Sequence, residues 1–327
     1  MACYHPLKAK PIGINLETGK TIYALSKLKP GDDREGFKLI PCGQCIGCRI
    51  DYSRQWADRC MLEAKDHESN YFLTLTYDDD HLDTVKTGYI ENGTGEYKEI
   101  LSLNKRDLQL WHKSLRKALD EKGYSKIRFF ACGEYGSPKN TMRPHYHEIV
   151  FGLVLDDLKF YKYNKLKQPL YTSEFLNNIW KKGYVIIGDV TWQSCAYVAR
   201  YVTKKMKGEG MELYREKNLV PPFTLMSRKP GIGRKYYDEH PEMFDYSYIN
   251  LSTPDGGIKI FPNKYFKSLL EVDDPAAFEN LRNINNIKSQ NNTDFKDEVS
   301  DLDYADQLEL EETLFNNRIR IMSRNEV

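Results

Sequence analysis

The sequence has 327 residues, of which 40% are hydrophobic and 29% charged, and these proportions indicate a globular protein of about two domains with a substantial core. No apolar run reaches the roughly 18 residues that a membrane-spanning helix needs, and the N-terminus lacks the apolar stretch of a secretory signal, so we expect a cytosolic protein with no membrane partner. The net charge of +1 conceals a contrast between residues 198–235, with ten Lys or Arg against three Glu, and residues 271–327, with six Lys or Arg against fourteen Asp or Glu. The cationic stretch suits either a phosphate backbone or an ordinary solvated surface.

The N-terminal part of the chain combines a flexible composition with one helical pattern. Residues 1–48 are rich in Gly, Pro and Lys, which predicts loop. Residues 49–67 are predicted to be a helix, because Trp56, Cys60 and Leu62 fall near one side.

The middle of the chain alternates strand patterns with helical patterns. The predicted elements are a strand at 71–77, a loop or hairpin at 84–102, a helix at 104–121, strands at 126–132 and 145–153, a helix at 173–182, a strand at 184–190 and a helix at 193–207. From residue 71 to 190 the order is β-α-β-β-α-β, which is typical of the ferredoxin-like α+β fold. In that antiparallel sheet the first and third strands are central neighbours, and the second strand pairs with the third.

The C-terminal region differs in composition from the rest. Asn280–Thr293 is rich in Asn and is expected to be loose, whereas Asp301–Ile321 is expected to form an acidic amphipathic helix. These patterns divide the chain into a Cys-rich segment with a helix (1–66), a central α+β domain (67–260) and an acidic C-terminal extension (261–327).

His145 and His147 lie two residues apart on a predicted strand, so both imidazoles point to one face. Such a pair alone is more often ordinary surface or core than a metal site. Glu134 follows the strand expected to pair with theirs, which brings its carboxylate close, although a solvated Glu in a Gly-flanked turn is the alternative. Two imidazoles and a carboxylate leave positions of an ion open for phosphate oxygens, and this mixed set suits Mg²⁺ or Mn²⁺.

Tyr197 and Tyr201 are four residues apart on a predicted helix and share a face, with Lys204 on the same side. A phenol is a poor nucleophile unless an ion polarises the phosphate that it attacks, and a lysine can stabilise the charge that develops. Two such tyrosines allow two successive DNA strand transfers through 5′-phosphotyrosine. Packing is the alternative, since the chain has 23 tyrosines.

Three cysteines form two overlapping C-x-x-C spacings, at Cys42, Cys45 and Cys48, with Cys3 or His5 available as a fourth ligand. In a reducing cytosol this spacing suggests structural zinc, with free thiols or an iron–sulfur cluster as alternatives. The odd total of seven cysteines argues against a disulfide framework.

Residues 226–235 combine two glycines with four basic side chains, which suits a phosphate-contacting loop or a basic surface turn. With two residues of the tyrosine helix included, the predicted DNA-binding residues are Arg200, Lys205, Arg228, Lys229, Arg234 and Lys235.

Taken together, these motifs resemble the HUH endonuclease superfamily, and within it the rolling-circle replication initiators of microviruses. The matching segments are FLTLTY (72–77), RPHYHEIVFG (143–152) and YVARYVTKK (197–205), and for the gokushovirus group PCGQCIGCR (41–49), SRQWADRC (53–60), CGEYG (132–136), IGDVT (187–191) and SRKPGIG (227–233). The resemblance covers residues 41–235. It implies an HUH domain within 67–260, Glu134 as third ligand, Mg²⁺ or Mn²⁺, and nicking and joining of single-stranded origin DNA in the cytoplasm of a bacterial host.

The sequence contains no G-x-x-x-x-G-K-[ST] motif, so we expect a host helicase to unwind the DNA and a host polymerase to extend it. Three other interpretations stay open. A plasmid-type initiator or relaxase would share the chemistry. A zinc-stapled nucleic-acid-binding protein would lack it, and a metal phosphoesterase would use water in place of tyrosine.

Overall fold

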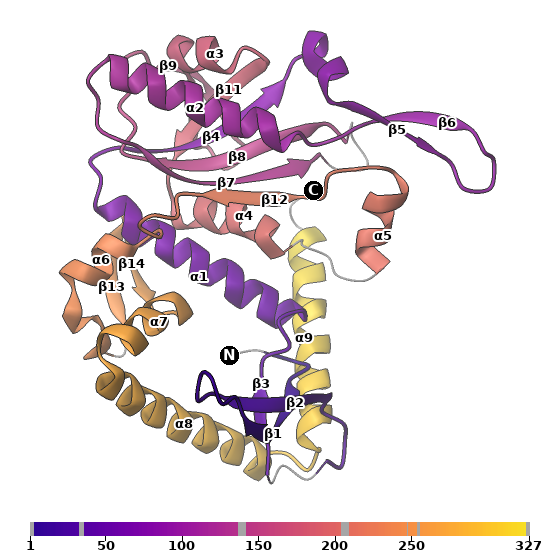
Figure 1. Cartoon of the computed structure of the whole chain (residues 1–327), viewed down its shortest axis with the longest axis vertical. Helices are drawn as coiled ribbons and strands as arrows, with labels where there is room; N and C mark the ends of the chain where they lie inside the picture. The colour runs from indigo at the N-terminus through magenta and orange to yellow at the C-terminus, as the bar shows by residue number, and fades with distance from the viewer. Residues whose placement is uncertain are drawn as a thin grey trace. The chain divides into compact units, whose positions relative to one another are not determined.

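The computed structural model describes residues 3–32, 36–136, 142–203, 209–246, 248–253 and 256–324 (Figure 1). The chain divides into two compact units: unit 1 comprises Met1–Tyr52 and Lys264–Val327, and unit 2 comprises Ser53–Asn263. The three-part division at residues 66 and 260 stays a prediction. Among the helices of the described residues, none is both long and apolar enough to cross a bilayer.

Unit 2 is built on a seven-stranded antiparallel sheet, and the expected α+β class with an antiparallel sheet is confirmed. In spatial order the strands are β12 (Phe223–Met226), β7 (Arg128–Tyr135), β8 (Pro144–Phe151), β4 (Asn70–Tyr77), β11 (Gly183–Asp189), β10 (Pro169–Thr172) and β9 (Lys159–Tyr163). β4 and β8 are central neighbours, and β7 lies beside β8, as the β-α-β-β-α-β order predicts. The sequence did not predict β9, because all of its residues are exposed and no apolar face marks it as a strand.

Helices cover both faces of this sheet (Figure 1). α2 (Lys105–Glu121) and α3 (Glu174–Trp180) pack on one face, in a cluster that includes Tyr146 and Val150 of β8. The unit 2 part of α1 (Ile46–Lys65) and α4 (Trp192–Thr203) pack on the other face, in a cluster that includes Ile149 and Phe151. Because alternate side chains of β8 are buried on opposite faces, the sheet is held rigidly along its length.

Caps and turns fix the helices of unit 2 where the sequence predicts them. The Asn104 side chain accepts a hydrogen bond from the backbone N–H of Arg106 and begins α2, and Ser173 begins α3 in the same way. The remaining elements are η1 (Asp79–Val85), the hairpin of β5 (Lys86–Ile90) and β6 (Tyr97–Leu101), α5 (Glu209–Glu216), α6 (Arg234–Glu239), η2 (Pro241–Phe244), and the hairpin of β13 (Ile249–Thr253) and β14 (Gly256–Ile260).

Unit 1 contains structure that the composition did not predict. Its elements are a sheet in the order β2 (Thr21–Lys27), β1 (Leu7–Ile14), β3 (Lys38–Ile40), and the helices α7 (Lys264–Asp273), α8 (Pro275–Glu298) and α9 (Tyr304–Arg324). The prediction of loop before residue 48 is wrong because β2 is exposed throughout and shows no alternation of apolar and polar residues. The prediction of a loose Asn-rich segment is also wrong. Asp274 caps α8, Pro275 occupies its first turn, and the Asn285 side chain donates to the carbonyl of Leu281.

Candidate metal and tyrosine site

The register of β7 and β8 brings Glu134, His145 and His147 together. Glu134 pairs directly with His145, and His147 is two residues further along the same face of β8. One ligand atom from each of the three residues lies within 4.8 Å of the others. The Nε2 atoms of His145 and His147 are each 3.0 Å from Oε1 of Glu134. These three side chains therefore converge as the sequence predicts, on the sheet face covered by α1 and α4.

Hydrogen bonds on the far side of each ring orient the two imidazoles. Nδ1 of His145 lies 3.0 Å from the carbonyl oxygen of Arg143, and Nδ1 of His147 lies 2.9 Å from the hydroxyl of Thr74. The Phe72 ring stacks on His147 at a centroid distance of 5.5 Å. A ring that donates from Nδ1 presents the lone pair of Nε2, which is the arrangement of most histidine metal ligands.

Burial prepares this cluster for a cation. The side chains of Glu134 and His147 are only 5% and 9% exposed, and burial lowers the pKa of His147 below its usual value. His147 is therefore neutral at pH 7, the form that binds a metal. On the side of His145 the cluster adjoins a pocket of about 360 Å³ lined by Thr76, Tyr77, Asp78, Asp79, Arg143, Pro144, His145 and Tyr184. A ligand approaching the cluster therefore has an open path beside His145.

Tyr197 points from α4 into the cluster. Its hydroxyl donates a hydrogen bond of 3.0 Å to Oε1 of Glu134 and lies 3.5 Å from Nε2 of His147. The neighbouring residues Cys195, Ala196, Val198 and Ala199 are buried against the sheet, so packing fixes the orientation of the helix. Tyr201 follows one turn later in α4, but its side chain, Lys204 and Lys205 lie outside the described residues. Arg200 is exposed.

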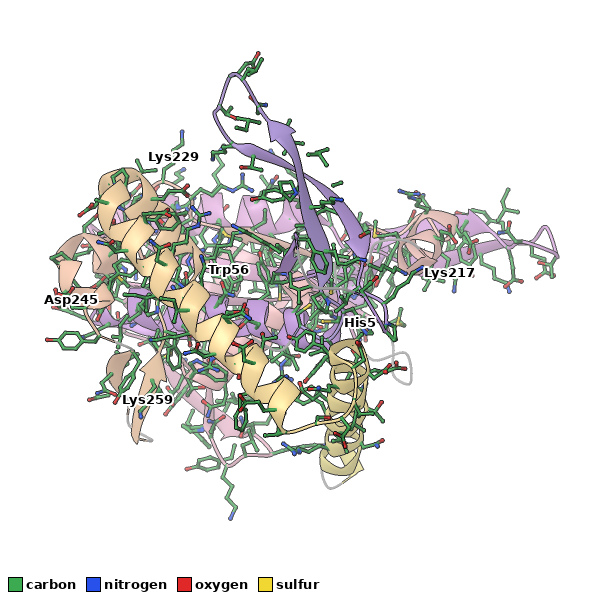
Figure 2. The ribbon with its side chains drawn as sticks, turned by 90° about the horizontal axis from the view of Figure 1, so that it is seen from below. His5, Trp56, Lys217, Lys229, Asp245 and Lys259 are labelled. Atoms are coloured by element: carbon green, nitrogen blue, oxygen red, sulfur yellow. The ribbon has the colours of Figure 1, made fainter. Side chains whose placement is uncertain are left out.

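The predicted basic loop lies at the other end of the sheet. Ser227 hydrogen-bonds Phe129, which precedes Glu134 by five residues, or about 16 Å along a strand. Arg228 and Lys229 are exposed there, and the Lys229 side chain extends into solvent (Figure 2). The other two predicted DNA-binding residues carry acidic neighbours in α6, as the pairs Arg234–Asp238 (2.8 Å) and Lys235–Glu239 (3.7 Å) show. The structure does not bring these four residues to the histidine cluster.

Buried contacts hold the backbone of this loop against α1 and β7. The guanidinium of Arg59 donates to the carbonyl of Ile232 at 3.0 and 2.8 Å, and the N–H of Gly233 donates to Glu63 at 2.6 Å. Arg128 donates to the carbonyl of Pro230 and pairs with Glu63. The glycine-rich segment thus has a packing role as well as exposed basic side chains.

The sequence motifs did not single out two residues that shape the site. Thr74 stands in register with His147 in the pairing of β4 and β8, and its hydroxyl orients that ring. Arg143 supplies the carbonyl that orients His145, and its guanidinium lines the pocket and pairs with Asp79 at 2.5 Å. The strand YFLTLTY contained the necessary signal, because Thr74 faces the same side as the histidines once β4 and β8 are paired.

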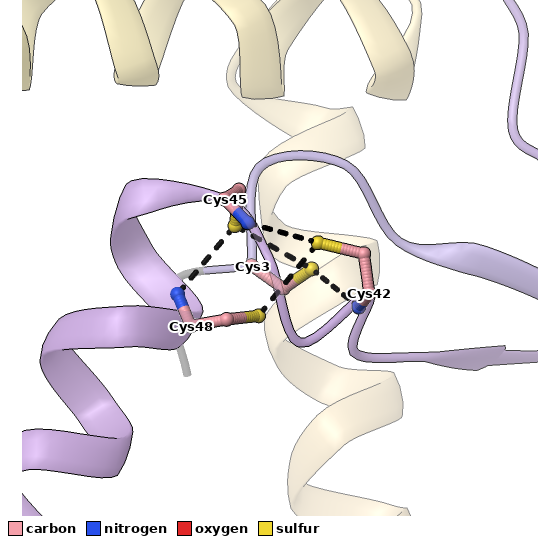
Figure 3. Close-up of side chains that lie close together, drawn as sticks. All are labelled: Cys3, Cys42, Cys45 and Cys48. Carbon is pink, nitrogen blue, oxygen red and sulfur yellow. Dashed lines mark hydrogen bonds between the residues drawn. The ribbon is translucent and has the colours of Figure 1, made fainter. Parts of the chain in front are cut away.

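A second cluster of metal-ligand type lies in unit 1. The Sγ atoms of Cys3, Cys42, Cys45 and Cys48 all lie within 4.8 Å of one another (Figure 3). His5, the other candidate for the fourth ligand, instead pairs with Glu312 of α9, with 2.6 Å between Nε2 and Oε2. The structure therefore favours Cys3 over His5 as the fourth member of this cluster.

Comparisons with known proteins agree with these motifs. A family model described as replication-associated protein ORF2 matches residues 70–206. The chain is 32% identical to replication-associated protein ORF2 of Spiroplasma virus 4, over 99% of this chain and 98% of that protein. It is 33% identical to replication-associated protein VP4 of Bdellovibrio phage phiMH2K, over 81% and 76% of the two chains.

A third relative is replication-associated protein ORF4 of Chlamydia phage 1, which is 35% identical over 51% of this chain and 38% of that protein. No solved structure matches the chain. The family model and the near full-length relative agree on one assignment, and the residues that form the histidine and tyrosine cluster fall within the matched range 70–206. The chain therefore belongs to the family of replication-associated proteins of these phages, the microvirus rolling-circle replication initiators.

Proposed function

We propose that this chain is an HUH-type DNA nickase and ligase that starts rolling-circle replication of a small circular single-stranded phage genome. The observation that carries the proposal is the position of the Tyr197 hydroxyl, 3.0 Å from Glu134 and 3.5 Å from His147. A phenol at an imidazole and carboxylate cluster, beside an open pocket, has the components of phosphoryl transfer in one place. The printed names of the relatives, which are replication-associated proteins, agree with such a role.

The residues fit a divalent ion. Two neutral imidazole nitrogens and one carboxylate are suitable ligands for Mn²⁺ and, with more water, for Mg²⁺. Because these ligands come from one sheet face, other coordination positions face away from the strands. When bound, the ion would polarise the scissile phosphate and help to stabilise the oxygen that attacks it.

The proposed reaction is a transesterification. The phenol oxygen of Tyr197 forms a bond to phosphorus while the bond from phosphorus to the 3′ oxygen breaks. The phenol loses one proton and the departing 3′ oxygen gains one, so the reaction needs neither water nor a redox partner. The products are a 5′-phosphotyrosine and a free 3′-hydroxyl, which a polymerase can extend.

Tyr201 is the proposed second nucleophile. It follows Tyr197 by one helical turn in α4, so the two residues share a helix face. One tyrosine would cut the origin and the other the regenerated origin. The free 3′-hydroxyl then attacks the phosphotyrosine, which closes the circle and restores the phenol. Lys204 is proposed to stabilise charge during these transfers.

Other proposed contacts concern DNA and the host. Phosphate contacts are assigned to Arg200, Lys205, Arg228, Lys229, Arg234 and Lys235, of which the last four would act at a distance from the cut. We expect a host helicase and a host polymerase as partners, and the bacterial cytoplasm as the location.

A denaturing-gel assay on strand cleavage tests the proposal. Overlapping single-stranded fragments of the genome that encodes the chain are labelled at either end and incubated with the protein and Mn²⁺. A 3′-labelled fragment should appear as a protein–DNA adduct, and the 5′-labelled product should end in an extendable 3′-hydroxyl. EDTA and the double variant Tyr197→Phe/Tyr201→Phe should both abolish the adduct.

Other outcomes would favour other functions. Cleaved DNA without an adduct would indicate a phosphoesterase that uses water. DNA binding without cleavage of any fragment, unchanged in the double variant, would indicate a binding protein.

A further inference from the structure

The four cysteines of unit 1 come from three segments of the chain. Cys3 precedes β1, Cys42 follows β3, and Cys45 and Cys48 lie at the start of α1. Figure 3 shows their sulfur atoms gathered at one point. We propose that these four thiolates hold a structural zinc ion, which fastens the N-terminal end of the chain to the start of α1 and supports the packing of α9 beside it.

The sulfur positions fit one tetrahedral ion. Four sulfurs at the usual Zn–S distance of about 2.3 Å stand about 3.8 Å apart. Here Cys42 and Cys48 are separated by 4.0 Å, as are Cys3 and Cys45. A disulfide needs about 2.05 Å, and all four thiols are free. In an iron–sulfur cluster several irons share the four cysteines, which would hold the sulfurs further apart.

Backbone N–H groups surround these sulfurs. Cys3 Sγ accepts from Cys42 at 3.3 Å, Cys42 Sγ accepts from Gln44 and Cys45 at 3.4 and 3.3 Å, and Cys45 Sγ accepts from Tyr4 and Cys48 at 3.4 and 3.5 Å. Such bonds stabilise negative charge on thiolates and are the outer support expected around a metal. Gly43 has a φ of 73°, which turns the chain so that the next two N–H groups point back at Cys42.

The site is closed by protein on several sides. Cys3, Cys45 and Cys48 are buried, and Tyr4, Ile46 and Phe315 pack against them. Four protein ligands fill a tetrahedral coordination sphere, so the site has no position for a substrate. These features indicate a structural ion rather than a catalytic one.

The surroundings show what the ion would support. Within β1 only Ala9 is buried, and β2 is exposed throughout, so this sheet contributes little core of its own. The Tyr4 ring lies 6.1 Å from the Phe315 ring of α9, and His5 pairs with Glu312. Zinc binding would therefore supply folding free energy to a part of the chain that lacks a large apolar cluster.

Metal analysis of the full-length protein, purified without chelators, tests the proposal without any variant. We expect about one zinc per chain, and on exchange with Co²⁺ the absorption of a tetrahedral cobalt–thiolate site. Iron with acid-labile sulfide, iron alone, or no metal together with four thiols that react freely with a maleimide would each overturn it.

Two variants locate the ion. Cys3→Ser and Cys45→Ser should each weaken zinc binding at least about tenfold. The matched controls Cys60→Ala and Cys195→Ala change buried cysteines of unit 2 and should keep the zinc. Retention of zinc in both cluster variants, or its loss in a control that remains folded, would contradict the assignment.

Limited proteolysis measures the structural role. After removal of zinc by a strong chelator, cleavage should increase within residues 1–52 and 264–327, while residues 53–263 stay protected. Equal protection of all regions with and without zinc would exclude the proposed structural role. This result does not depend on strand cleavage, so it separates failure of the zinc proposal from failure of the nickase proposal.

Discussion

The two ligand clusters of this protein are built in opposite ways. Glu134, His145 and His147 stand on adjacent strands, so the hydrogen-bonded register of β7 and β8 fixes their spacing. Cys3, Cys42, Cys45 and Cys48 come from chain segments on either side of a small exposed sheet. The first cluster can keep its geometry without an ion, whereas the second draws on its ion for part of its structure.

The donor atoms differ as much as the scaffolds. Imidazole and carboxylate ligands with an adjoining pocket suit an exchangeable ion that meets a phosphate, and four thiolates suit a retained ion. The comparison teaches that rigidity supplied by a sheet leaves coordination positions for chemistry. Rigidity supplied by an ion uses all of them.

Loss of the nucleophile should have the largest effect. Tyr197→Phe keeps the ring that packs edge-on against His147 but removes the hydroxyl that donates to Glu134. We expect the first nicking step to slow on the order of 10⁴-fold, with unchanged thermal unfolding. Single-turnover adduct formation measures the rate. Tyr124→Phe, which removes a hydroxyl bonded to Asp156, is the control and should retain normal activity.

Removal of a ligand comes next. His147→Ala should lower nicking on the order of 10³-fold, because the ion loses an imidazole at a buried position. Binding of single-stranded DNA should change little, since phosphate contacts rest on Lys and Arg. Fluorescence anisotropy and the gel assay measure the two properties separately. His240→Ala, at an exposed ion pair with Glu242, should behave as wild type, and normal nicking by His147→Ala would remove the metal site from the account.

A smaller effect is expected where the ligand stays but loses its support. Thr74→Val removes the hydroxyl 2.9 Å from Nδ1 of His147, and we expect affinity for Mn²⁺ to fall about 10- to 100-fold. Added Mn²⁺ should restore most of the nicking. Thr74→Ser keeps the hydroxyl and should remain within a few-fold of wild type. If Val and Ser behave alike in Mn²⁺ titrations, Thr74 does not position the ring.

The last prediction concerns the stability of unit 2 without an ion. Burial alone would raise the pKa of Glu63, but hydrogen bonds from His67 and Gly233 and the charge of Arg128 outweigh it and hold the pKa below its usual value. A depressed carboxyl pKa in the folded state stabilises the fold at neutral pH, and this stability is lost as the pH falls through the folded-state pKa.

Glu63→Gln should therefore lower the free energy of unfolding by about 2 kcal/mol at pH 7 and flatten its decline below about pH 4.5. Denaturant unfolding at several pH values measures both effects. Glu68→Gln, at an exposed position, is the control. Equal unfolding curves for Glu63→Gln and wild type would show that this buried pair is not needed for stability.

The sequence predicted the catalytic half of the molecule better than the rest. Residues 71–190 carry strong periodic patterns, so the central pairing of β4 and β8, and with it the meeting of Glu134 and the histidines, followed from element order. Thr74 was missed because its role depends on register rather than on residue type. The distance of Arg228 from the cluster was missed because nothing in the sequence shows that β12 pairs with β7 and carries the loop to the far end. The exposed β2 and the Asn-rich α8 lack the apolar patterns from which such elements are predicted.

Anomalous X-ray scattering from crystals grown with Mn²⁺ tests the contrast between the two clusters most directly. The account predicts a manganese peak bound by Glu134 and by Nε2 of both histidines, next to the Tyr197 hydroxyl, and a zinc peak among the four cysteines. Manganese bound elsewhere, or a Tyr197 hydroxyl turned away from the bound ion, would contradict the proposed chemistry.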